Sequence, residues 1–108
     1  NLRFALERNK AALRISDGAK IFSYSGDTQW TDALLPVASG ADLFIVECYD
    51  YDRELTGHMN WATIRRRLAD FKARRVMLTH MNPTMLAKID EAKAHGVLVA
   101  EDGLVLDL

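Results

Sequence analysis

Two short, wholly apolar runs constrain the fold of this chain more than any other feature. Residues 43–46 read Leu-Phe-Ile-Val, and residues 76–79 read Val-Met-Leu-Thr. Because neither run alternates polar with apolar residues, each predicts a strand covered on both faces, as in a parallel sheet. The stretch between them has apolar residues at helical spacings of 3, 4 and 3: Trp61, Ile64, Leu68 and Phe71. With Asn60 as the N-cap, strand, helix and strand in succession predict an α/β fold.

Shorter elements are expected before this unit. The β-prone runs 12–16 and 21–25 surround Asp17-Gly18, a pair typical of a hairpin turn. Helical spacing is seen for Trp30, Ala33, Leu34 and Val37, but Pro36 cannot donate a backbone hydrogen bond. We therefore expect a short, late-starting or kinked helix there. The first ten residues fit either a strand or a helix.

The C-terminal quarter predicts one more helix and a hairpin. Pro83-Thr84 is a typical helix start, and the apolar spacing that follows predicts a helix ending at Gly96. Residues 97–100 and 104–108 are apolar and flank Glu101-Asp102-Gly103, which predicts a terminal hairpin.

Length and composition limit the class of protein. A chain of 108 residues, 49% apolar and 27% charged, is expected to form one domain segment, residues 1–108. Its net charge of -1 gives no argument for a nucleic-acid or membrane partner. With Cys48 as the only cysteine and no apolar run of about 20 residues, we expect a cytoplasmic protein outside the membrane. The sequence begins at Asn1 rather than Met, which leaves open a processed or excised fragment.

Asp27 and His80 are candidate metal ligands because each follows a β-prone run. Ligands of open α/β sheets gather outside the carboxyl ends of the strands, where a carboxylate and an imidazole would meet. Both side chains bind zinc at about 2.0–2.2 Å, but zinc usually takes at least three protein ligands. The alternatives are that Asp27 caps a helix and that His80 merely ends a strand.

Four short segments carry a resemblance to a known family. In chain order they are Ser25-Gly26-Asp27-Thr28, residues 40–47 (Gly-Ala-Asp-Leu-Phe-Ile-Val-Glu), Gly57-His58 and Leu78-Thr79-His80. In this order and spacing they resemble the second half of a metallo-β-lactamase-superfamily hydrolase, over roughly residues 12–108. The branch they resemble includes ribonuclease Z and related phosphodiesterases.

The resemblance implies a fold, a metal and a reaction. The fold would be α/β, half of a four-layer αββα sandwich. Asp27 would bridge two zinc ions, His80 would complete the ligand set of one of them, and His58 would face the substrate and assist proton transfer. In the complete enzyme a metal-bound hydroxide would attack a small-molecule ester or a phosphodiester-type substrate.

The sequence also departs from the family pattern. The principal ligand motif His-x-His-x-Asp-His does not occur in it, and its three histidines are His58, His80 and His95. The resemblance therefore implies that an N-terminal half, a second chain or self-association completes the sandwich and the site. The alternative function is a non-catalytic α/β interaction module that retains the fold. A phosphoacceptor module using Asp27 and Thr79 is less favoured, because no Lys ends a further parallel strand.

Other polar residues have structural and functional interpretations. His58 is either a proton-transfer group or a hydrogen-bonded loop residue. His95 precedes Gly96, and an imidazole is favourable at a helix C-terminus. Glu47 is expected to orient a neighbouring group through its carboxylate, and Cys48 is expected to be a small buried residue.

One cluster of positive charge stands out within the sequence. It comprises Arg65, Arg66, Arg67, Lys72, Arg74 and Arg75. These residues alternate around the apolar stripe, which favours a solvated helix face, although they could also hold substrate phosphates. Trp30 and Trp61 have helical spacing and are expected in the core rather than in a substrate pocket.

Overall fold

The computed structural model describes residues 5–9 and 12–108, with side chains from residue 12 onward. Its centre is a six-stranded sheet with the strands in chain order. The strands are β1 (Ala5–Asn9), β2 (Ala12–Ser16), β3 (Ile21–Tyr24), β4 (Leu43–Glu47), β5 (Val76–Thr79) and β6 (Leu98–Val99). The β1–β2 and β2–β3 pairs are antiparallel, whereas β3, β4, β5 and β6 run parallel to one another. The hairpin and both buried strands predicted from sequence are confirmed.

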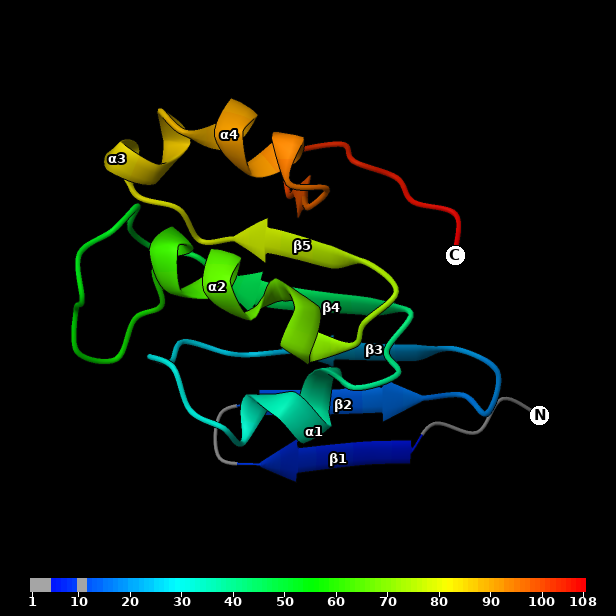
Figure 1. Ribbon diagram of the computed structural model, residues 1–108. Helices are drawn as coiled ribbons and strands as arrows, with labels where there is room; N and C mark the ends of the chain where they lie inside the picture. Colours follow the sequence, from blue (N-terminus) through cyan, green and yellow to red (C-terminus); the bar gives the residue numbers. More distant parts are fainter. Residues whose placement is uncertain (1–4, 10–11) are drawn as a thin grey trace.

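Two helices cover one face of this sheet. In Figure 1, α1 (Leu34–Ala38) and α2 (Trp61–Phe71) lie in front of the strands, while α3 (Pro83–Leu86) and α4 (Ile89–Ala94) lie beyond β5. The Asn60 side chain accepts a hydrogen bond from the Thr63 N–H at 2.8 Å, which confirms the predicted N-cap of α2. Among the described residues no helix has the length and apolar character needed to cross a membrane.

The short helix α1 is fastened to the sheet by one arginine. Arg14, in β2, donates hydrogen bonds to the backbone carbonyls of Val37 and Ser39 at 2.9 and 2.8 Å. These carbonyls lie at the C-terminal end of α1, where a helix leaves its acceptors without internal partners. A cation at this end is also favoured by the helix dipole.

The main core lies between the sheet and α2. Phe44 and Val46 of β4 and Leu78 of β5 are fully buried in it. The Phe44 ring packs edge-on against Phe71 of α2, with ring centres 5.0 Å apart. Trp61 is 1% exposed, so its predicted place in the core is confirmed, whereas Trp30 is only half-buried, packs against the core and lines two hollows at the surface.

The opposite face of the sheet is also apolar. Alternation along β4 places Leu43 and Ile45 on the face away from Phe44. Their register partners are Phe22, which is 37% exposed, and Met77. Part of this face, with the C-terminal leucines Leu104, Leu106 and Leu108, lines an apolar cavity of about 390 Å³. None of the four helices is drawn on this side (Figure 1).

Two sequence-based expectations about the C-terminal quarter are wrong. The single helix predicted to end at Gly96 is instead α3 and α4, because the Lys88 N–H bonds to Met85 O, three residues back, and the turn tightens. Asp90 and Glu91 then favour a new helix start. The predicted terminal hairpin is absent from the described residues, since β6 pairs in parallel with β5 and residues 104–108 form no strand.

Candidate metal and catalytic site

The candidate site lies where three parallel strands end. β3, β4 and β5 run in the same direction, with Tyr24 opposite Ile45 and Glu47 opposite Thr79. Asp27 follows β3 by three residues, and His80 follows β5 directly. The segments that carry both candidate ligands therefore leave the sheet at one edge, as their positions after β-prone runs predicted.

Glu47 is the buried anchor of this edge. It is 0% exposed, and its Oε1 lies 2.6 Å from His58 Nδ1. Its Oε2 accepts hydrogen bonds from the backbone N–H groups of Thr28 and Met59, both at 3.3 Å. Its own N–H donates to Ser25 Oγ at 2.9 Å. Glu47 thus joins the segments after β3 and β4 and fixes the imidazole of His58.

This pairing determines which nitrogen of His58 is available. A carboxylate oxygen only accepts, so Nδ1 of His58 carries the proton that it shares with Glu47. Nε2 is left for other partners. The imidazole is about one-third exposed and lines a cavity of about 360 Å³.

His80 lies across from His58. The two rings are nearly parallel, at 9°, with centres 6.2 Å apart. Tyr49 contacts both, with its ring centre 4.6 Å from that of His58 and 5.6 Å from that of His80. Three aromatic rings, two from the loop after β4 and one from the loop after β5, thus form one wall of the site.

Donor atoms of Glu47, His58 and His80 all lie within 4.8 Å of one another. Two ligands of one tetrahedral zinc ion, each about 2.0 Å from the metal, are about 3.3 Å apart. The 2.6 Å separation between Glu47 and His58 is instead that of a charge-assisted hydrogen bond. The geometry therefore supports Glu47 as the orienting carboxylate predicted from sequence, rather than as a ligand beside His58.

Asp27 is exposed at the same edge of the sheet. Burial, followed by the negative charges of Asp27 and Glu47, raises the pKa of the Tyr24 phenol. Both carboxylates therefore act on one hydroxyl. Within the described residues, the three-residue donor group does not include Asp27, so its role as a metal ligand stays a prediction.

His80 adopts an unusual backbone conformation. Its φ angle is +59°, in the left-handed region that side chains with a Cβ rarely occupy. Histidine is among the residues enriched there, and such angles are concentrated at functional sites. The carboxylate of Asp27 and the exposed imidazole of His80, both at the carboxyl ends of the strands, are ligand types that fit a zinc site.

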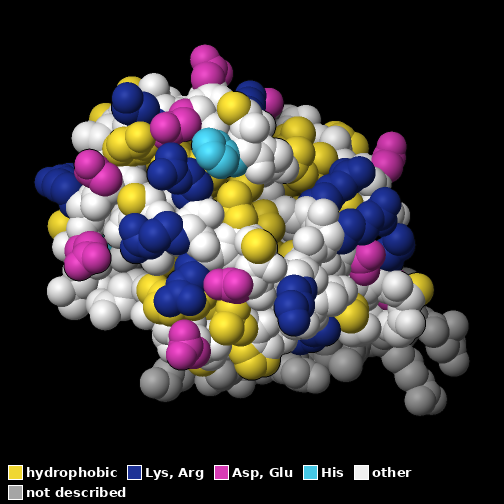
Figure 2. All heavy atoms as spheres, viewed as in Figure 1, with side chains coloured by type: hydrophobic (Ala, Val, Ile, Leu, Met, Phe, Trp, Pro, Cys, Tyr) yellow, Lys and Arg dark blue, Asp and Glu magenta, His cyan; other side chains and the backbone are white. Residues whose placement is uncertain are grey.

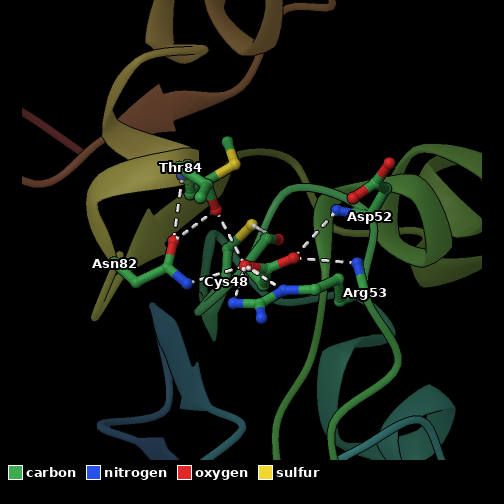
Figure 3. A network of polar contacts seen from close by, with 7 residues as sticks. Cys48, Asp52, Arg53, Asn82 and Thr84 are labelled. Atoms are coloured by element: carbon green, nitrogen blue, oxygen red, sulfur yellow. Dashed lines mark hydrogen bonds and ion pairs between the residues drawn. The ribbon is translucent and has the colours of Figure 1, made fainter.

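Sequence reasoning missed Asp50, which joins the two loops that carry the histidines. Figure 3 shows Arg53, Asn82 and Thr84 around it. The Asp50 carboxylate accepts from the Asn82 amide and the Thr84 hydroxyl, both at 2.7 Å, and from the Arg53 guanidinium at 3.1 Å. Burial works to raise the pKa of Asp50, but these hydrogen bonds outweigh it and hold that pKa well below its usual value.

Asn82, two residues after His80, continues this network toward the site. Its side-chain Oδ1 accepts a hydrogen bond from the Met85 N–H at 3.0 Å and so caps α3. Its backbone N–H donates to Tyr49 O at 2.7 Å. No sequence motif marks Asp50, because two of its partners, Asn82 and Thr84, are separated from it by more than 30 residues.

Two other polar residues have the structural roles predicted for them. Cys48 is fully buried, and burial, with the charges of Glu47 and Asp50, raises its pKa to about 12. Its thiol is therefore neutral at physiological pH and is a poor metal ligand or nucleophile. His95 is the C-cap residue of α4, with Nδ1 3.0 Å from Glu91 O.

The basic cluster on and after α2 is largely solvated. Figure 2, viewed as in Figure 1, shows Lys and Arg side chains interspersed with acidic ones over this face. Arg67 lies 3.5 Å from Asp70, and Arg74 lies 3.9 Å from Asp42. Exposed pairs of this kind contribute little to stability.

An α/β layer with polar groups converging at the carboxyl ends of parallel strands is the arrangement of a ligand-binding α/β domain. Residues 5–81 match the sequence model of the beta-lactamase superfamily domain. The chain belongs to the metallo-β-lactamase superfamily, as its sequence motifs predicted.

Sequence relatives agree with this assignment. The probable metallo-hydrolase YhfI of Bacillus subtilis is 36% identical over 73 residues, which cover 65% of this chain and 30% of YhfI. The uncharacterized protein ML1173 of Mycobacterium leprae is 38% identical over 89 residues, covering 76% of this chain and 31% of ML1173. The chain thus spans about a third of the length of these relatives.

Solved structures confirm the predicted fold class. The metallo-beta-lactamase fold protein YhfI of Bacillus subtilis has a TM-score of 0.74 at 28% identity, covering 98% of this chain and 49% of YhfI. Zn²⁺-bound PqqB of Methylobacterium extorquens has a TM-score of 0.77 at 23% identity, covering 97% of this chain and 46% of PqqB. Human tRNase Z, short form, has a TM-score of 0.67 at 20% identity, covering 89% of this chain and 37% of the tRNase Z chain. The last two likenesses concern the fold alone.

Proposed function

We propose that this chain is part of a metal-dependent hydrolase that cleaves an ester or a phosphodiester-type bond. The observation that carries this proposal is the pairing of Glu47 with His58, 2.6 Å apart, directly across from His80 at the carboxyl edge of the sheet. A buried carboxylate that fixes one imidazole nitrogen leaves the other aimed for proton transfer.

Asp27 and His80 are the residues of this chain that would hold the metal. The chemistry that bound zinc supplies is the activation of water and the stabilisation of developing negative charge. The likeness to the probable metallo-hydrolase YhfI supports a metal, and we expect two zinc ions in the complete enzyme. The remaining ligands would come from outside these 108 residues.

His58 would act on the substrate rather than on the metal. With Nδ1 held by Glu47, Nε2 can give a proton to the leaving group or orient the substrate. Tyr49, stacked on His58, holds the plane of the ring. The hydrogen bond between Asp50 and Asn82 holds the loop that carries His80 in position beside this pair.

A second layer is proposed to cover the apolar face that contains Phe22, Leu43, Ile45 and Met77. Exposed apolar area costs about 25 cal/mol per Å², so a partner layer stabilises the sheet. The solved relatives, of whose chains this one covers about half or less, support an additional half of the sandwich as that partner. No observation favours the alternative of a non-catalytic module.

Hydrolysis by the full-length protein tests the proposed function. Purified protein supplied with zinc would be assayed against a carboxylic ester, a thioester and bis(4-nitrophenyl) phosphate. We expect turnover of at least one substrate, its loss on chelation and its return with zinc. Folded, metal-loaded protein that hydrolyses none of them, or activity that resists chelation, would contradict the proposal.

A further inference from the structure

Two neighbouring hollows share the lining residues Trp30 and Glu54, and together they are called the groove. The first, of about 360 Å³, is lined by His58, Thr56, Trp30 and Glu54, among others. The second, of about 470 Å³, shares Trp30 and Glu54 with the first and extends to Arg66 and Arg67. The groove thus has the imidazole of His58 in the lining of one hollow and two arginines of α2 in the lining of the other.

Trp30, which lines both hollows, is held in place by several contacts. The Trp30 ring packs against Phe71 with ring centres 6.0 Å apart, and its Nε1 donates to Asp32 at 3.2 Å. The Arg67 guanidinium lies 4.6 Å from the centre of the Trp30 ring. Such cation–π contacts fix the position of an arginine without consuming its hydrogen-bond donors.

The charges change along the groove. Glu54 is exposed and adds a negative charge to the lining of both hollows. Asp70 pairs with Arg67 on the solvent side at 3.5 Å, and Arg66 Nη2 lies 3.4 Å from Thr63 Oγ1, beyond ideal hydrogen-bond length. Among the described residues Arg66 forms no ion pair, so its charge and most of its hydrogen-bond donors are available to a ligand.

We propose that this groove is the substrate subsite of the hydrolase and that it selects small substrates with a terminal oxyanion, a phosphate or a carboxylate. The reacting bond lies at His58, the middle of the substrate lies along Trp30, and the oxyanion lies at Arg66 and Arg67. The inference rests on the proposed function for the reaction, but the anion site itself stands on the groove alone.

Binding without catalysis tests this subsite. Full-length protein, stripped of metal with a chelator, would be titrated with phenylphosphonate, benzoate, benzyl alcohol and inorganic phosphate in a calorimeter. We expect both aromatic anions to bind at least tenfold more tightly than the neutral alcohol and than inorganic phosphate. The ratio between the two aromatic anions distinguishes a phosphate-selective from a carboxylate-selective site, and binding should weaken as salt is raised.

A matched pair of variants separates the groove from general charge. Arg66→Ala and Arg65→Ala each remove one exposed positive charge from α2, but Arg65 is not among the residues that line either hollow. Arg66→Ala should weaken phenylphosphonate binding about tenfold or more, as the loss of a charge-assisted hydrogen bond does. Arg65→Ala should change it less than twofold.

Each outcome decides between the two proposals. Equal weakening by Arg65→Ala and Arg66→Ala, or no preference for anions, would overturn the subsite. Anion binding that depends on Arg66, in a protein that shows no hydrolysis when loaded with zinc, would support the subsite and contradict the proposed function. Where an ester is hydrolysed, Arg66→Ala should raise KM for substrates with a terminal carboxylate and leave KM for neutral ones unchanged.

Discussion

At the scale of single residues, the buried carboxylate of Glu47 determines what His58 can do. The carboxylate accepts a hydrogen bond from Nδ1–H of His58, and two backbone N–H groups donate to its other oxygen. His58→Ala in the full-length protein should therefore lower turnover by roughly 10²–10⁴-fold, the range for losing a general acid or base, while the metal stays bound. Turnover assays with metal analysis on the same sample check this. Unchanged turnover would return His58 to a structural loop role, and loss of metal would make it a ligand.

His80 combines a proposed functional role with an unfavourable backbone angle. At φ +59° a residue with a Cβ is strained by about 1 kcal/mol, whereas glycine is not. Urea unfolding of metal-free protein should therefore show His80→Gly to be at least as stable as His80→Ala. Both variants should bind zinc more weakly than wild type. A glycine variant clearly less stable than the alanine variant would show that the angle stores no strain.

At the scale of elements, the loops after β4 and β5 are joined by Asp50. Because its pKa is lowered in the folded protein, its stabilising effect is fully present above the pKa of an unfolded carboxyl, about 3.9. That effect is lost as the pH falls toward the lowered value. Asp50→Asn should thus cost about 2–4 kcal/mol of unfolding free energy at pH 7, less as the pH falls below about 4.

Denaturant unfolding at several pH values measures this difference. Asp52→Asn is the matched control, since it removes the same charge from an exposed neighbour and should cost less than about 0.5 kcal/mol. The charged partner that faces Asp50 is Arg53, which stays charged over this range. A loss of unfolding free energy in Asp50→Asn that does not change with pH would mean that the charge of Asp50 does not contribute to stability.

The elements differ in how far the sequence predicts them. The runs at β4 and β5 and the stripe on α2 were predictable because burial dictates apolar residues at fixed spacing. The break at Lys88 between α3 and α4 was not, since it depends on a local hydrogen bond that apolar spacing does not reveal. Likewise, His58 and His80 carry recognisable motifs, whereas the Asp50 network and the groove beyond Trp30 arise only when distant segments pack together.

At the scale of the whole molecule, the incompletely covered apolar face of the sheet is the dominant feature. Phe22 on this face is 37% exposed, and Ile45 is only half-buried. We therefore expect the isolated 108-residue chain to self-associate or to need a second layer, and Phe22→Lys to shift it toward the monomer. Light scattering with metal analysis checks this. A monodisperse wild-type monomer carrying two zinc ions would contradict it.

Asp27 and His80 are proposed to hold metal, whereas Glu47 and His58 are proposed to form a separate proton-transfer pair. The most direct test is the zinc content of full-length wild type, Asp27→Ala, His80→Ala and His58→Ala, purified identically and measured by mass spectrometry. We predict that Asp27→Ala and His80→Ala lose zinc, whereas His58→Ala retains the wild-type amount. Full zinc in Asp27→Ala together with loss in His58→Ala would contradict the account and place the metal on the cluster of Glu47, His58 and His80.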